Sequence, residues 1–275
     1  DIGTAKIKKE QMQDVTHYMI DEWNPDEEFN VMIFQKRVKE IMEDIYNRGK
    51  IPILVGGTGF YIQAVLNDIA FTKEKQGDEI RADLQNLAKE KGASYLHHEL
   101  QKVDKESAEA IHPNNIKRVI RALEYFQSTG QKFSDHNKEE RQKGSPYNFL
   151  YLVLTMNRKV LYERIDKRVD QMMEEGLVKE VKQLLDAGYS RNLVSMQGLG
   201  YKEIASALFK ECTMEEAVYR LKRDTRHFAK RQMTWFRRER DVTMINKDNF
   251  SNNHEIVNYI MKLAVEKGIC SCREG

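Results

Sequence analysis

The segment over residues 31–66 constrains the fold more than any other part of the chain. Apolar residues recur at intervals of three and four over 31–45 after Asn30, a favoured N-cap residue, which predicts a helix. The continuous apolar run Ile51-Pro-Ile-Leu-Val55 follows, and then the turn Gly56-Gly-Thr-Gly59 and a second periodic stretch. Helix, buried strand, glycine turn and helix in that order predict a parallel α/β layer.

The character of the chain changes at about residue 73. Charged amphipathic segments at 78–90, 93–103 and 115–129 contain no strand-like run, and a polar loop is expected over 135–145. Further strands are expected at 149–154 and 241–246, on either side of a long helix that begins with the capping pattern of Thr213 and Glu216. We therefore expect an α/β core over residues 1–72 and 145–275, interrupted by an all-helical insertion domain over 73–144.

Composition narrows the class of protein. The chain is 40% hydrophobic and 32% charged, which is typical of a globular protein with a substantial core. Its apolar runs are far shorter than the roughly 20 residues of a membrane helix, so we expect no membrane association and see no signal peptide. The three cysteines, Cys212, Cys270 and Cys272, form an odd set that suits a reducing cytosol, so a cytoplasmic location is expected.

Positive charge is concentrated near the carboxyl end. Residues 221–240 carry eight Lys or Arg residues against Asp224 and Glu239. Such a segment can bind a polyanion, because cationic side chains release counterions from phosphates, but it can equally be a solvated helix face. Gln232 interrupts the apolar seam between Phe228 and Trp235, where a buried amide is either structural or directed at a bound base.

Three further groups of residues can bind phosphate, and each has a plain structural alternative. The turn at 56–59 lies at the amino end of a predicted helix, where backbone N–H groups favour an anion, but it lacks the lysine of a Walker loop and can be a mere connector. Arg164 and Arg168 stand one helical turn apart and can clamp a diphosphate, or remain solvated. Lys117, Arg118 and Arg121 lie in the first turns of a predicted helix.

Taken together, seven blocks resemble bacterial tRNA dimethylallyltransferases over nearly the whole chain, in the same order and at suitable distances. They are Asp1-Ile-Gly-Thr-Ala-Lys6, Thr16-His-Tyr-Met-Ile-Asp21, Ile53-Leu-Val-Gly-Gly-Thr-Gly-Phe-Tyr61, His112-Pro-Asn-Asn115, Arg118-Val-Ile-Arg-Ala-Leu-Glu124, Gly198-Leu-Gly-Tyr-Lys202 and Ala229-Lys-Arg-Gln-Met-Thr-Trp235. The resemblance implies a P-loop-NTPase-like parallel sheet flanked by helices. It also implies transfer of a dimethylallyl group from dimethylallyl diphosphate to the exocyclic amine of the adenosine 3′ of the anticodon, with Mg²⁺, in a monomer.

The resemblance also implies roles for individual residues. Thr58 and Arg168 would be catalytic, and the diphosphate would be bound by Gly56, Gly57, Thr58, Gly59, Arg164 and Arg168. The residues expected to contact tRNA are Arg81, Lys117, Arg118, Arg121, Gln197, Gly198, Gly200, Tyr201, Lys202, Lys230, Arg231, Gln232, Trp235 and Arg237. No residue is assigned as a metal ligand. The glycine turn and the arginine-rich long helix would form opposite sides of one cationic tunnel.

The chain departs from the family pattern at its start. Family members carry a Gly-Pro-Thr-Ala-Ser-Gly-Lys-Ser/Thr phosphate loop and an Asp-Ser-x-Gln segment before the block that begins here at Asp1. We expect the chain as printed to lack both, and to be inactive or nearly so by itself. Two alternatives stay open: a small-molecule or nucleoside kinase of the P-loop superfamily, and a non-catalytic tRNA-binding fragment.

Overall fold

The computed structural model describes residues 1–71 and 77–271, and it divides into two compact units. Unit 1 comprises Asp1–Ile62 and Asn148–Gly275, and unit 2 comprises Gln63–Tyr147. The expected domain boundary at 72/73 and Cys272 lie outside the described residues. The sequence assigns catalysis to the α/β core and tRNA contact to the helical insertion. That assignment stays a prediction.

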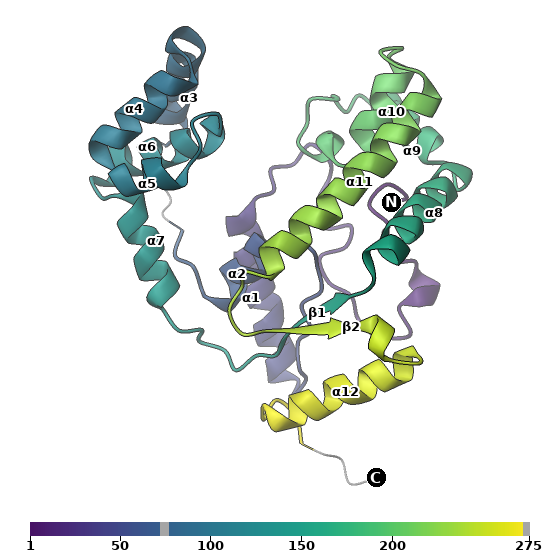
Figure 1. Ribbon diagram of the computed structural model, residues 1–275. Coiled ribbons are helices and arrows are strands. Elements are labelled where there is room, and N and C mark those ends of the chain that lie inside the picture. The colour runs from purple at the N-terminus through teal and green to yellow at the C-terminus, as the bar shows by residue number, and fades with distance from the viewer. Residues whose placement is uncertain (72–76, 272–275) are drawn as a thin grey trace. The chain divides into compact units, whose positions relative to one another are not determined.

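Unit 1 contains a two-stranded parallel sheet. Strands β1 (Tyr151–Thr155) and β2 (Val242–Asn246) pair in register, with Tyr151 opposite Val242. The chain leaves β1, passes through four helices between residues 158 and 236 and returns to β2 beside it, as Figure 1 shows. Both strands fall where the sequence predicts them, and their parallel pairing confirms the expected α/β class.

The helices of unit 1 begin at favourable capping residues. Asn30 accepts hydrogen bonds from the backbone of Met32 and Ile33 at the start of α1, and Thr213 accepts one from Glu216 N at 3.1 Å at the start of α11. Apart from short 3₁₀ turns, the unit's helices are α1 (Val31–Asn47), α2 (Gly59–Leu66, which continues into unit 2), α8 (Arg158–Glu174), α9 (Leu177–Asp186), α10 (Tyr201–Leu208), α11 (Met214–Phe236) and α12 (Asn253–Glu266).

The principal core of unit 1 lies among α8, α9, α10 and α11. Its buried side chains come from all four helices and the turn before α10: Val169, Leu177, Val181, Met196, Tyr201, Ile204, Ala205, Ala217 and Leu221. Two ion pairs cross from α11 to α8, Arg226–Asp166 at 2.5 Å and Lys222–Asp170 at 2.6 Å. Apolar burial and these pairs fix α11 on α8, so the residues of α11 have a defined position in the unit.

The expected buried strand at 51–55 is wrong. The described residues pair no strand with it, and Ile53 and Val55 are 84% and 86% exposed. An apolar run has strand propensity, but a strand forms only where a neighbouring backbone accepts its hydrogen bonds. Residues 51–55 are therefore an extended, exposed connection that leads from α1 into the glycine turn.

Unit 2 is entirely helical where it is described. It contains α3 (Gly77–Lys91), α4 (Ala93–Val103), α5 (Lys105–Ala110), α6 (Ile116–Thr129) and α7 (Phe133–Gln142) around a core that includes Leu96, Leu100 and Val119. The expected loop over 135–145 is wrong, because α7 occupies most of it. Phe133 packs against Tyr125 with ring centroids 5.6 Å apart, so tertiary contact orders a segment whose composition suggests a loop.

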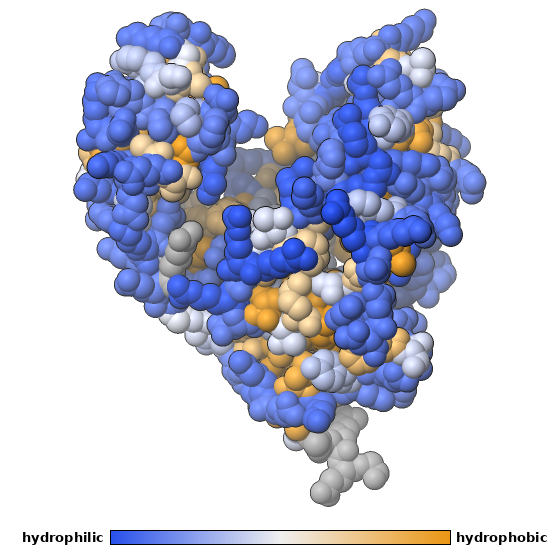
Figure 2. Space-filling view, viewed as in Figure 1, coloured by the Kyte–Doolittle hydropathy of each residue, from blue (hydrophilic) through white to orange (hydrophobic). Residues whose placement is uncertain are grey.

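The surface is mostly hydrophilic on the face drawn in Figure 2. Blue side chains cover α8, α10 and α11, whereas apolar side chains reach the surface around the sheet and α12. Leu154, Met244 and Val257 are among the exposed apolar residues there. No helix in the described part of the chain combines the length and apolar character needed to cross a bilayer.

Candidate active site

The glycine turn leads directly into α2. The backbone oxygen of Thr58 accepts hydrogen bonds from Tyr61 N at 2.9 Å and Ile62 N at 3.2 Å, so Thr58 stands at the amino end of the helix. Thr58 is exposed and Gly59 is buried. Partial positive charge gathers at such a helix end, which favours an anion beside the Thr58 hydroxyl.

Helix α11 lies against the glycine turn. Gln232 Nε2 donates a hydrogen bond to the backbone oxygen of Gly57 at 2.9 Å. A Cβ atom added at Gly57 would lie 2.1 Å from that nitrogen, and one added at Gly59 would lie 2.1 Å from Cδ1 and Nε1 of Trp235. A side chain at position 59 would therefore collide with the Trp235 ring, whereas one at position 57 would displace the Gln232 amide from its hydrogen bond.

Arg164 and Arg168 form one exposed row on α8. The buried Val169 separates this row from Asp166 and Asp170, which pair with α11 on the other side of the helix. Among the described residues neither arginine has an ion-pair partner, and no hydrogen bond joins either of them to the glycine turn. Both guanidinium groups are thus accessible to an anion, and their role as diphosphate ligands stays a prediction.

The predicted tRNA contacts before and within α10 differ in exposure. Gln197 is exposed and Lys202 is half-buried, so both can reach a ligand. Gly198 and Gly200 shape the turn, and Gly200 has a φ of +94°, a conformation that favours glycine. Tyr201 is 6% exposed and donates its hydroxyl hydrogen bond to Glu180 Oε1 at 2.7 Å, so it packs inside the unit.

Glu180 anchors the first block of the chain. Its carboxylate accepts hydrogen bonds from Ile2 N at 2.7 Å and Gly3 N at 3.2 Å as well as from Tyr201. Burial alone would raise the pKa of Glu180, but the bonds from Ile2, Tyr201 and Gly3 outweigh it and hold the pKa below its usual value. A Cβ at Gly3 would lie 2.6 Å from the Tyr201 ring, so this block also needs its glycine.

The long helix ends in an exposed cationic stretch. Lys230, Arg231 and Arg237 are exposed beside Gln232 and Trp235, and the Arg231 guanidinium lies 5.8 Å from the centroid of the Phe228 ring. The Arg231 and Phe228 side chains thus share one surface of α11, and such a pair of cationic and aromatic groups suits RNA, which offers phosphates for pairing and bases for stacking.

In unit 2 two of the predicted tRNA contacts, Arg81 and Arg121, pair with one buried carboxylate. Arg81 donates to Glu124 Oε1 at 2.8 Å and Arg121 lies 3.3 Å from the same oxygen. The Glu124 side chain is 2% exposed, whereas those of Arg81 and Arg121 are 45% and 40% exposed. Lys117 and Arg118 are exposed on the first turn of α6. Glu124 therefore holds two predicted contact residues in fixed orientations.

Comparison with known proteins decides the family. Residues 1–239 match the family model described as IPP transferase. The chain belongs to the IPP transferase family. It is 56% identical over 269 residues to the tRNA dimethylallyltransferase of Lachnoclostridium phytofermentans, covering 98% of this chain and 86% of the relative.

Solved structures agree with this family. A full-length tRNA isopentenylpyrophosphate transferase from Bacillus halodurans superposes with a TM-score of 0.70 at 43% identity, over 98% of this chain and 84% of that one. A eukaryotic dimethylallyltransferase acting on tRNA superposes with a TM-score of 0.78 at 26% identity, over 95% and 69%. The fold of this IPP transferase is thus a P-loop-like α/β fold with an added helical unit.

Three glutamates of this IPP transferase were not among the residues predicted from the sequence. Glu124 and Glu203 orient predicted contact segments, and Glu180 anchors the first block. Spacing could have indicated two of them. Glu124 follows Arg121 by three helical positions, and Glu203 follows Gly200 by three, as in a capping box.

The described residues offer no preformed metal cradle. No three His, Cys, Asp or Glu side chains among them lie close enough to hold an ion. Mg²⁺ commonly binds through substrate phosphates and few protein ligands. Mg²⁺ therefore stays an expectation from the family, and no residue of this IPP transferase is assigned to it.

Proposed function

We propose that this IPP transferase moves a dimethylallyl group from dimethylallyl diphosphate to the exocyclic amine of the adenosine directly 3′ of the tRNA anticodon. Its relative at 56% identity is named tRNA dimethylallyltransferase, and a solved eukaryotic neighbour acts on tRNA. One structural observation carries the proposal to particular residues: the glycine turn lies directly against Gln232 and Trp235 of the cationic helix α11.

The turn and the arginines of α8 serve the diphosphate. The amine nitrogen attacks the allylic carbon, the bond from that carbon to the diphosphate oxygen breaks, and the diphosphate leaves with the electron pair. Negative charge grows on the leaving oxygens, so the Thr58 hydroxyl, the helix end behind it and Arg168 stabilise the transition state. Arg164 binds the distal phosphate. The proton that the amine loses is assigned to no residue of this chain.

Gln232 and Trp235 serve the adenine base. Gln232 uses its amide nitrogen on Gly57, so its amide oxygen can accept a hydrogen bond from the exocyclic amine. The half-exposed indole of Trp235, next to Gly59, offers a stacking surface for an unstacked purine. The base would thus be held at the edge of the turn that binds the diphosphate.

We also infer the metal ion, the oligomeric state, the location and the tRNA-backbone contacts of the enzyme. Mg²⁺ accompanies the diphosphate and neutralises part of its charge. The enzyme acts as a monomer in the cytoplasm. Lys230, Arg231 and Arg237 with Arg81, Lys117 and Arg118 bind the tRNA backbone.

The test uses the full-length natural protein with dimethylallyl diphosphate and unmodified tRNA that carries adenosine beside the anticodon. Mass spectrometry of nuclease digests should show one prenylated adenosine per tRNA. Absence of that product overturns the proposal. ATP consumption that needs a small acceptor and ignores tRNA would identify a kinase instead, and salt-sensitive tRNA binding without chemistry would identify a binding module.

A further inference from the structure

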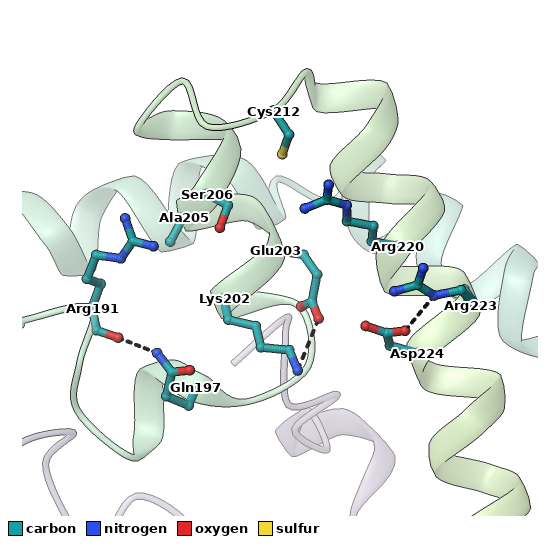
Figure 3. Close-up of a pocket in the computed structure, with 10 residues that line it drawn as sticks. All are labelled: Arg191, Gln197, Lys202, Glu203, Ala205, Ser206, Cys212, Arg220, Arg223 and Asp224. Carbon is teal, nitrogen blue, oxygen red and sulfur yellow. Dashed lines mark hydrogen bonds and ion pairs between the residues drawn. The ribbon is translucent and has the colours of Figure 1, made fainter. Parts of the chain in front are cut away.

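Unit 2 contains a partly buried histidine to which the proposed reaction gives no part. His97 lies on α4, and its ring contacts the end of α5. The pocket drawn in Figure 3 is a different case, because it lies in unit 1 and is lined by the predicted tRNA contacts Gln197 and Lys202. That pocket belongs to the predicted tRNA interface, whereas His97 is not part of any site predicted from the sequence.

His97 caps the end of α5 from a neighbouring helix. Its Nε2 lies 2.9 Å from the carbonyl oxygen of Ala108 and 2.9 Å from that of Ile111. Carbonyl oxygens only accept hydrogen bonds, so Nε2 carries a proton and donates to both. Helix α5 ends at Ala110, and the last carbonyls of a helix find no N–H partner within it. The imidazole therefore supplies a donor that α5 itself lacks.

The capped end of α5 leads straight into two predicted tRNA contacts. Ile111 is followed by the turn at 112–115, in which Asn115 N donates a hydrogen bond to His112 O at 2.8 Å. Helix α6 begins directly after the turn, with Lys117 and Arg118 exposed on its first turn. Lys117 follows Ile111 by only six positions. The orientation of the Ile111 carbonyl thus bears directly on where these two cations point.

Other contacts keep α5 in place on unit 2. Ala108 and Ile111 are 4% and 6% exposed and belong to the apolar core of the unit. Asp104 caps the opposite end of the helix, where its carboxylate accepts a hydrogen bond from Ser107 N at 3.0 Å. The position of α5 does not depend on His97 alone. What His97 adds is the direction of the chain as it leaves the helix.

We propose that His97 is a positioning residue for tRNA binding. Its bonds to Ala108 O and Ile111 O set the course of the turn at 112–115, and the turn places Lys117 and Arg118 for phosphates of the tRNA. His97 itself touches neither substrate. This inference rests on the proposed function and adds to it a residue that acts through two cations.

A purely structural role for His97 predicts a different salt dependence. If His97 only stabilised unit 2, its loss would lower the fraction of folded protein and weaken tRNA binding by one factor at every salt concentration. Lost phosphate contacts instead flatten the plot of log affinity against log salt concentration, by about 0.7–0.9 for each phosphate that is no longer neutralised. The slope of that plot therefore separates positioning from stability.

The first test measures tRNA affinity of the full-length protein over a range of salt concentrations. Leucine in His97→Leu has no donor, and we expect about tenfold weaker binding with a slope flatter by about 1.5, while the KM for dimethylallyl diphosphate stays unchanged. His97→Gln keeps a side-chain N–H and should recover most of the affinity. His98→Leu is the matched control, because His98 is the next residue and is exposed, and it should change neither quantity.

The second test asks whether His97 acts through Lys117. Lys117→Gln should weaken tRNA binding several-fold in the otherwise wild-type protein and have little further effect in the His97→Leu background. If His97→Leu does not fold, His97→Asn replaces it in both tests, because its amide is too short to reach the two oxygens. An unchanged salt slope, or an equal loss from Lys117→Gln in both backgrounds, overturns the inference.

Failure of the inference and failure of the proposed function have different signatures. If the wild-type enzyme prenylates tRNA but the slope ignores His97, then His97 is a structural residue and the transferase assignment stands. If no prenylated adenosine forms, the proposed function fails whatever the binding data show. A flatter slope without prenylation would leave His97 as a positioning residue in an RNA-binding protein of another activity.

Discussion

Gln232 on α11 donates a hydrogen bond from its side-chain nitrogen to the backbone oxygen of Gly57, across 175 residues of sequence. This bond joins the phosphate-binding turn to the cationic helix, the two elements that the proposed reaction brings together. Gly56 and Gly57 of the turn differ in how closely side chains of α11 approach them. A substitution at each position can therefore test the contact.

Gly57→Ala should reduce prenyl transfer more than tenfold while the protein stays folded. The added Cβ would lie 2.1 Å from Gln232 Nε2, so the flexible amide must swing away and lose its hydrogen bond, at a cost of about 1 kcal/mol. Gly56→Ala is the matched control, because nothing lies within 4 Å of its added Cβ. Equal activity of the two variants in a steady-state assay would contradict the assigned contact.

Arg168→Lys should lower kcat/KM about tenfold, equivalent to roughly 1.4 kcal/mol of transition-state stabilisation. Lysine keeps the charge but cannot bind a phosphate through two parallel hydrogen bonds. Arg168 is exposed, so the free energy of unfolding should change by less than about 0.5 kcal/mol. Arg158→Lys, in the first turn of the same helix, serves as control. Loss of activity in the control alone would rule out the assigned diphosphate site.

Glu124→Gln should lower both stability and tRNA affinity. The buried carboxylate receives charged hydrogen bonds from Arg81, and their weakening should cost about 1–3 kcal/mol in urea unfolding. Arg81 and Arg121 would then lose their fixed orientation, and tRNA binding should weaken. Glu109→Gln, an exposed partner of Lys105, should affect neither measurement. Unchanged tRNA binding in Glu124→Gln would show that these arginines do not contact tRNA.

Asp104→Asn should destabilise the protein in a pH-dependent way. Burial would raise the pKa of Asp104, but hydrogen bonds from Ser107 and Ser134 outweigh it and hold the pKa below its ordinary value of 3.8. The folded state thus favours the ionised form, which contributes stability above pH 3.8 and loses it as the pH falls through the depressed pKa. Urea unfolding at pH 7 should show a deficit of about 1–3 kcal/mol in the variant. The deficit should shrink below pH 3.8, and a constant deficit would argue against this linkage.

Local patterns predicted the capped helices and both paired strands. The capping residues of α1 and α11 lie where the sequence indicates, and both paired strands coincide with apolar runs. Residues 51–55 show the limit of such patterns. Their apolar character predicts a strand, but pairing depends on a neighbour that no local pattern specifies.

Helix α7 illustrates the opposite failure. Its charged composition suggests a loop, yet Ser134 N donates to the buried Asp104 at 2.9 Å and Phe133 packs on Tyr125. Asp104 lies 30 residues before Ser134, and Tyr125 belongs to the preceding helix α6, so contacts from outside α7 override its weak local preference.

The candidate site was only partly predictable. The glycine turn, the α8 arginines and the cationic helix are visible as motifs, whereas Glu180, which anchors the first block of the chain, emerges only from the fold. Glu180 lies 178 residues from the backbone of Ile2 that it binds. No spacing rule connects two such positions, because their proximity follows from how α9 packs in the core.

The exposure of residues 51–55 has a practical consequence for handling the protein. Ile53 and Val55 face solvent, and the described chain gives this segment no backbone hydrogen-bond partner. An extended apolar edge of this kind recruits strands from other molecules. A polypeptide limited to the 275 residues printed here should therefore precipitate in a concentration-dependent manner, and a charged residue at position 53 should keep it dispersed.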